Sequence, residues 1–247
     1  MLKINKYSLI KNAAVLGVAT LSLSLIATSS SFSDGHIYGE NNPVTVKGYK
    51  GSKTDSTAYT GQIARQLQHN SLKKIVSKGN PNDPSSNTLN KMMNYFENKD
   101  KAKTMAILDP KSSSKFPVKQ KIVGEISTGS NLAGKADERP QLSWPNNMSG
   151  ADVIRFMIKK ASKISGGVDM RNGMNYPQLI SKYTMGAVLY HQACDNYLDE
   201  KMTASNKPND KPYKKGAPYT GKEHSWDEAF GYWGAAAHTM TLSAKQS

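Results

Sequence analysis

Apolar residues recur at helical spacing in several stretches of this chain. In the clearest one, four apolar side chains occupy positions i, i+3, i+4 and i+7 and share one helix face: Leu89, Met92, Met93 and Phe96. Ser86 or Asn87 precedes them as a candidate cap, which predicts that a helix begins there. An earlier helix is predicted over residues 60–78, because an imperfect apolar stripe ends there at the turn-forming segment GNPNDP.

Three more helical segments are predicted in the second half of the chain. The first covers residues 152–164, with Asp152 in its first turn and two glycines, Gly166 and Gly167, after its end. The second begins at Pro177, since proline suits the first helical position, and extends for about six turns. Its predicted apolar face consists of Leu179, Ile180, Tyr183, Ala187, Tyr190, Cys194, Tyr197 and Leu198. After a loop over residues 203–220, an aromatic segment from about Lys222 is also predicted to be helical.

Between these regions, residues 99–145 show little periodicity and are rich in Ser, Gly, Lys and Pro. A short helix over residues 101–108 and a strand-like piece over residues 121–126 are the elements expected there. So long an irregular stretch is unusual in a compact domain and indicates a functional insertion or a mobile segment. The whole pattern predicts an all-α protein: a helical bundle formed by residues 57–98 and 149–240, with a long irregular insertion between helices.

The first 33 residues have the layout of a secretory signal peptide. Lysines at positions 3, 6 and 11 precede an apolar run over residues 13–27, and small polar residues follow. The apolar run is too short to span a bilayer comfortably. We therefore expect cleavage near Ser33, which leaves residues 34–247 as one α-helical domain with no transmembrane segment, periplasmic or secreted. An uncleaved membrane anchor is the alternative.

The charge of the chain is strongly positive. Its net charge of +14 falls to +11 when the three leader lysines are removed. Nucleic acid is nevertheless not the expected partner, because the protein is expected to be exported and only four of its bases are arginine, the residue best suited to phosphate and base contacts. A lysine-rich surface of this kind is mostly solvated and attracts anionic ligands or membranes weakly.

The sharpest chemical signal is the segment EHSWDEAFGYWG near the C-terminus. On a helix, His224 has Asp227 at i+3 and Glu228 at i+4, so the three side chains can share a face. A second pair, His191 and Asp195, has i, i+4 spacing on the preceding helix. If the two helices pack side by side, these five residues form a plausible ligand set for Fe or Zn. The alternative is that the aromatic and charged side chains here are an ordinary helix cap and core.

Signatures of common enzymes do not occur in the sequence. The chain has no HExxH, GxSxG or Walker A pattern, and its single cysteine, Cys194, is expected to be a buried, inert thiol. No nucleophile is nominated, so catalysis is not the leading expectation. Two hypotheses remain open: a protein of the cell envelope that binds a metal ion or haem iron during uptake, or a non-catalytic structural or protein-interaction module without metal.

Three segments carry a resemblance to a known family: YTGQIARQLQHN, QLISKYTMGAVLYHQACDNYL and KEHSWDEAFGYWGAA. They resemble a family of secreted bacterial α-helical proteins that is described only as a domain of unknown function, with WDEAFGY as the most specific block. The family is similar in outline to imelysin-like proteins of iron-uptake loci, whose hallmark is GxHxxE. That resemblance implies a helical fold and export, with His224 in the place of the hallmark histidine and Asp227 or Glu228 in that of the acid. Because the members look longer, an incomplete C-terminus is also expected.

Overall fold

The computed structural model describes residues 43–83, 86–98, 104–109, 121–127, 131–141 and 144–233. This part of the chain is mainly helical, as the sequence predicts, and its only β-sheet is a two-stranded hairpin. None of the helices in these ranges combines the length and the apolar character needed to cross a membrane. The expected signal peptide, residues 1–33, lies outside the described residues, as does the C-terminal end after residue 233.

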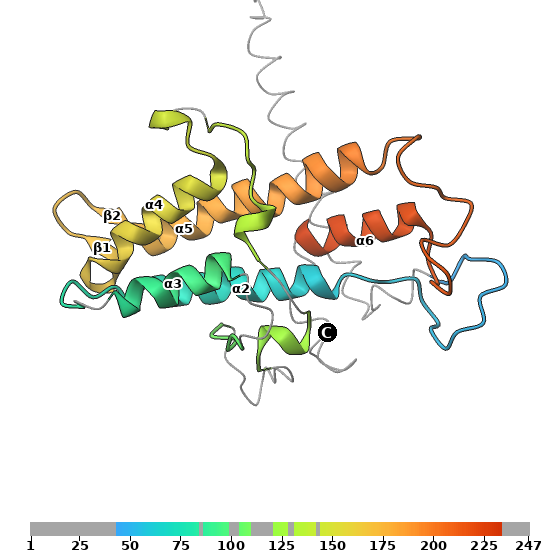
Figure 1. Cartoon of the computed structure of the whole chain (residues 1–247), viewed down its shortest axis with the longest axis horizontal. Helices are drawn as coiled ribbons and strands as arrows, with labels where there is room; N and C mark the ends of the chain where they lie inside the picture. The colour runs from blue at the N-terminus through green and yellow to red at the C-terminus, as the bar shows by residue number, and fades with distance from the viewer. Residues whose placement is uncertain are drawn as a thin grey trace, which may run out of the picture.

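The first two helices confirm the apolar pattern of the sequence. Helix α2 spans Thr60–Val76 and buries Ile63, Leu67 and Leu72 completely. Helix α3 spans Asn87–Glu97 and contributes two buried side chains, Met92 and Phe96, to the main core. The two helices pack against each other (Figure 1). Helix α2 ends just before the GNPNDP segment that was expected to stop it, with Ser77 rather than Gly79 as its C-cap.

Helix α4 spans Gly150–Ser162 and begins at a capping box. The Ser149 hydroxyl accepts the Asp152 N–H at 3.2 Å, and the Asp152 carboxylate accepts the Ser149 N–H at 3.3 Å. A hairpin that the sequence analysis missed then follows, formed by β1 (Val168–Asp169) and β2 (Met174–Asn175). The strands are antiparallel, with Val168 opposite Asn175. Each has only two residues, too few for an alternating pattern to be visible in sequence.

The long helix predicted from Pro177 is present, but its second part is not α-helical. Helix α5 (Tyr176–Thr184) continues directly into η7 (Met185–Glu200), a π-helix with i→i+5 hydrogen bonds. Buried side chains therefore recur every four or five residues, at Thr184, Val188, Ala193 and Tyr197. The face predicted from α-helical spacing is correct here for Ala187 and Tyr197, which are buried. It is wrong for Tyr190 and Leu198, which are exposed, and Cys194 is half-buried against the main core.

In the middle of the chain, the described residues do not adopt the expected secondary structure. Residues 104–109 are not helical; Ala106 instead forms a single antiparallel bridge with Ile122. The expected strand at residues 121–126 is a 3-10 helix, η3 (Val123–Glu125). Further 3-10 turns are η4 (Ala133–Lys135), η5 (Pro145–Asn147) and η6 (Ser165–Gly167). At residues 104–127 the contact of α2 with η3 and the pairing of Ala106 with Ile122 are tertiary interactions, which local propensity does not contain.

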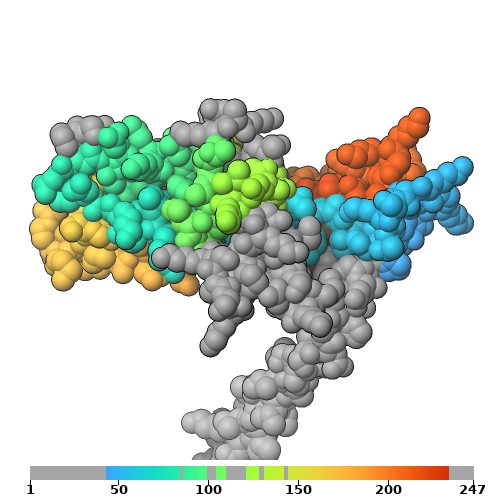
Figure 2. Space-filling model, turned by 90° about the horizontal axis from the view of Figure 1, so that it is seen from below, coloured from blue at the N-terminus to red at the C-terminus, as the bar shows by residue number. Residues whose placement is uncertain are grey.

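The last described helix, α6 (Gly221–Trp233), packs against η7 and α2. Helix α2 also contacts α5, and α4 contacts both α3 and α5. One main core therefore lies between these four helices (Figure 1). The segment before α2 lies beside the start of α6 at one end of the elongated molecule, and α3 lies at the other end (Figure 2). A hydrogen bond from Thr45 to Glu223 joins that first segment to α6.

Candidate functional site

The His224–Glu228 pair predicted from sequence is present on α6. The Nε2 atom of His224 lies 3.7 Å from Oε2 of Glu228, and both side chains are largely buried. Two tyrosines from the loop before α6 enclose the imidazole. The Tyr219 ring stacks on it with centroids 4.9 Å apart, and the Tyr213 ring lies at 4.6 Å. Loop, helix and ring stacking together hold the imidazole in one orientation.

Burial and nearby lysines keep His224 neutral. Desolvation is the main cause that lowers the pKa of His224 below its usual value. Glu228 opposes that shift, whereas Lys201, Lys207 and Lys214 add to it. The Nδ1 atom is buried and has no hydrogen-bond partner among the described residues. A neutral imidazole is the form that ligates metals, but the ammonium groups around it disfavour an added cation.

Asp227, the second predicted acid, is directed to a different neighbour. Its carboxylate accepts the backbone N–H of Ala58 at 3.0 Å and is almost completely buried. Burial raises the pKa of Tyr59 to about 12, with the negative charges of Asp227 and Asp55 adding to the shift. Asp227 thus links α6 by a hydrogen bond to the segment that precedes α2.

Glu228 lies at the centre of a charged cluster that the sequence analysis did not identify. Its Oε1 accepts the Gln62 side-chain N–H at 2.9 Å, and its charge acts on Lys135 and Lys201. Desolvation is the main cause that lowers the pKa of both lysines. These groups come from α2, from the turn at η4, from the end of η7 and from α6. No sequence spacing connects them, so only the packing of the helices could reveal the cluster.

Two tyrosines line this cluster between two cations. The Nζ atom of Lys201 lies 3.7 Å above the centre of the Tyr197 ring, and the Tyr197 and Tyr232 rings are 5.8 Å apart. The Arg65 guanidinium lies 5.5 Å from the centre of the Tyr232 ring. Burial raises the pKa of both tyrosines, and the Glu228 charge adds to the shift. The arrangement ties α2, η7 and α6 together through cation–π contacts.

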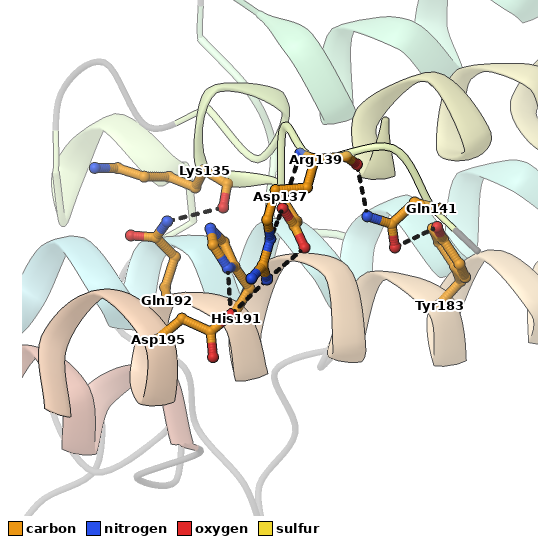
Figure 3. A network of polar contacts seen from close by, with 8 residues as sticks. All are labelled: Lys135, Asp137, Arg139, Gln141, Tyr183, His191, Gln192 and Asp195. Atoms are coloured by element: carbon orange, nitrogen blue, oxygen red, sulfur yellow. Dashed lines mark hydrogen bonds and ion pairs between the residues drawn. The ribbon is translucent and has the colours of Figure 1, made fainter. Parts of the chain in front are cut away.

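The second predicted pair, His191 and Asp195, belongs to a separate network on η7 (Figure 3). His191 Nδ1 donates to Asp195 Oδ2 at 3.0 Å, and Arg139 donates to the same oxygen at 2.7 Å. Arg139 also forms two 2.8 Å hydrogen bonds with Asp137, which hold the pKa of that carboxyl at about 2. Figure 3 shows this network continuing through Gln141 to Tyr183. Its evident role is to attach residues 131–141 to the long helix.

The five predicted site residues therefore fall into two pairs and one separate acid. Among the residues that the structure describes, no three His, Cys, Asp or Glu side chains are arranged to hold a metal ion. Asp195 is already engaged by Arg139, and Asp227 by the backbone of Ala58. Metal binding by these residues stays a prediction.

The outer side of α6 carries exposed aromatic side chains. Trp226 is 50% exposed and Trp233 is 68% exposed, although both belong to the most apolar residue types. With their neighbours they line an apolar groove of about 270 Å³, which we call the aromatic face: Leu198, Trp226, Ala229, Phe230 and Trp233. The α6 members follow i, i+3, i+4 and i+7 spacing, the pattern of a helix side that packs against another surface.

These features define a mainly helical protein in which aromatic and charged side chains meet where α2, η7 and α6 pack, and in which one helix side is apolar and open. The chain belongs to the family described as the domain of unknown function DUF4856, which matches residues 38–246. The resemblance to an uncharacterised family is confirmed to that extent. No curated protein and no solved structure shows a significant match to the chain.

Proposed function

We propose that this protein is an exported, non-catalytic interaction module that binds a partner protein of the cell envelope through the aromatic face of α6. The exposure of Trp226 and Trp233 on one side of a single helix carries this proposal. Tryptophan is among the residues most enriched at the energetic centres of protein interfaces. A partner that covers both indoles would bury apolar area that water now contacts. The favourable free energy of removing such area from water is roughly 25 cal/mol per Å².

The charged groups of the predicted site support a structural role for them. Arg139 forms ion pairs with both Asp137 and Asp195 and thereby joins two segments. Glu228 is hydrogen-bonded to α2 and surrounded by lysines. The contacts of α2 with α3 and α5, and of α4 with both, also support the helical-bundle architecture expected from the sequence. We also propose that the family is distantly related to imelysin-like proteins.

Site-specific photo-cross-linking tests the docking surface and works with a partner of any identity. The cross-linker p-benzoylphenylalanine is placed at Trp226 or Trp233, and at Met170 as the control. Met170 is 87% exposed but lies on the β1–β2 hairpin, away from α6. We expect one discrete adduct in intact cells from positions 226 and 233 and none from position 170. Equal adducts at all three positions, or none at 226 and 233, would contradict the proposal.

A metal ion at His224 and Glu228 is the second candidate function. It is favoured by the neutral imidazole, whose Nε2 lies 3.7 Å from a carboxylate oxygen of Glu228. If this function holds, the purified protein binds about one equivalent of Fe or Zn, and His224→Ala abolishes binding while helicity is retained. His191→Ala is the matched control and keeps the metal. If the histidine is a core residue, neither protein holds metal, and His224→Ala loses about 1–3 kcal/mol of stability.

A further inference from the structure

A cleft that shares only Trp233 with the aromatic face lies between α2, the junction of α5 with η7, and the end of α6. Its volume is about 690 Å³, within the range of roughly 300–1,000 Å³ typical of small-molecule sites. Helix α2 contributes His69 and Lys73, the α5–η7 helix contributes Lys182 and Tyr190, and α6 contributes Trp233. The cleft therefore combines three elements that are distant in sequence.

The start of the π-helix shapes one wall of the cleft. Met185 and Gly186, the first two residues of η7, line it, and no atom lies within 4 Å of where a side chain on Gly186 would begin. The wider helix turns Tyr190 outward, so that this residue is 56% exposed instead of packing in the core. Together with Met185 and Trp233, it forms an apolar wall that lacks cover within the described structure.

The polar lining of the cleft is positively charged. Lys73 and Lys182 are exposed, and neither forms an ion pair within the described residues, while Asp109 is the acid that lines the same cleft. His69 donates through Nε2 to the Ser181 carbonyl oxygen at 3.0 Å and is buried at the base. Burial lowers the pKa of His69, and the charges of both lysines contribute to the shift.

We infer that this cleft binds a small organic anion with a flat apolar body, whose charge pairs with Lys73 and Lys182 and whose body lies against Tyr190 and Trp233. Lysines and aromatic residues that line one cleft fit a ligand of that chemistry better than an apolar or a cationic one. Neutral His69 keeps its hydrogen bond to Ser181 and adds no charge. This inference does not depend on the partner-binding function of α6.

Fluorescence titration with 8-anilinonaphthalene-1-sulfonate, an aromatic sulfonate, tests the inference on the full mature chain. We expect saturable binding whose Kd rises at least tenfold in the double variant Lys73→Gln/Lys182→Gln. The matched control is Lys159→Gln/Lys163→Gln, which removes two exposed lysines on α4 and just after it, and changes the Kd less than twofold. N-phenyl-1-naphthylamine, which has the same rings without the sulfonate, should bind the wild type at least tenfold more weakly.

The aromatic face could also bind such a probe, so a further variant separates the two surfaces. Trp226 lines the aromatic face but not the cleft. Trp226→Ala should therefore leave the Kd unchanged within twofold, whereas Tyr190→Ala should raise it several-fold. Loss of binding in Trp226→Ala with normal binding in the lysine variant would overturn the inference, as would equal affinities in the two lysine double variants. Neither result depends on the cross-linking experiment.

Discussion

Gly79→Ala should destabilise this protein by about 3 kcal/mol, although the change adds a single methyl group. A Cβ atom at this position would lie 2.1 Å from the carbonyl oxygens of Ala161 and Ile164. Both neighbours are backbone atoms, so no side chain can rotate away. The chain is also held in place here, because Asn80 donates to the Ser162 carbonyl at 2.9 Å. We expect the melting temperature to fall by about 10 °C, measured by thermal unfolding of the mature chain.

Gly186→Ala is the matched control for that prediction. Space is open around this glycine, and its backbone is helical, so an added methyl group meets no atom within 4 Å. Alanine is favoured over glycine inside helices by about 0.5–1 kcal/mol, and we expect unchanged or slightly higher stability. If both variants lost the same stability, the close approach between the end of α2 and the end of α4 would not be the cause.

Phe96→Ala should cost about 3–5 kcal/mol and should release α3 in particular. The ring is completely buried in the main core, and Met92 is the other buried side chain of α3. Removing the ring therefore leaves this short helix with a single buried anchor. The Arg155 guanidinium, 5.8 Å from the ring centre, would also lose a contact. Urea unfolding measures the loss, and hydrogen exchange should show amides of α3 exchanging faster than those of α4.

Phe156→Ala on α4 provides the comparison for the same change of side chain. Phe156 is 38% exposed, and its ring makes an edge contact with the Trp144 ring, with centroids 6.0 Å apart. We expect a loss of about 1 kcal/mol, because a half-exposed ring gives up less apolar area and leaves no closed cavity. A loss as large as that of Phe96→Ala would show that burial in the main core does not decide the effect.

The two histidine pairs illustrate why a correct spacing does not establish a common site. Both pairs form at i, i+4 as the sequence predicts, since that distance is set by the helix itself. Their convergence would have required matched orientations of α6 and η7. Asp195 instead accepts a hydrogen bond from Arg139, a residue 56 positions away in sequence. Pairing between distant charges depends on tertiary packing, which local spacing does not contain.

The sequence by itself determined the helical character of the chain, the bounds of α2 and α4 to within a few residues, and the start of α3. Each of these depends on interactions within one or two turns, such as the Ser149–Asp152 capping box and the apolar stripe of α3.

Tertiary structure decided the rest. The π-helical η7 changed which residues face the core, because its hydrogen bonds shift the period of the helix from the one assumed for Tyr190 and Leu198. The cluster around Glu228 and the cleft beside Lys73 likewise join elements that are distant in sequence. The free energy that brings these elements together comes from burial of the common core rather than from any local pattern.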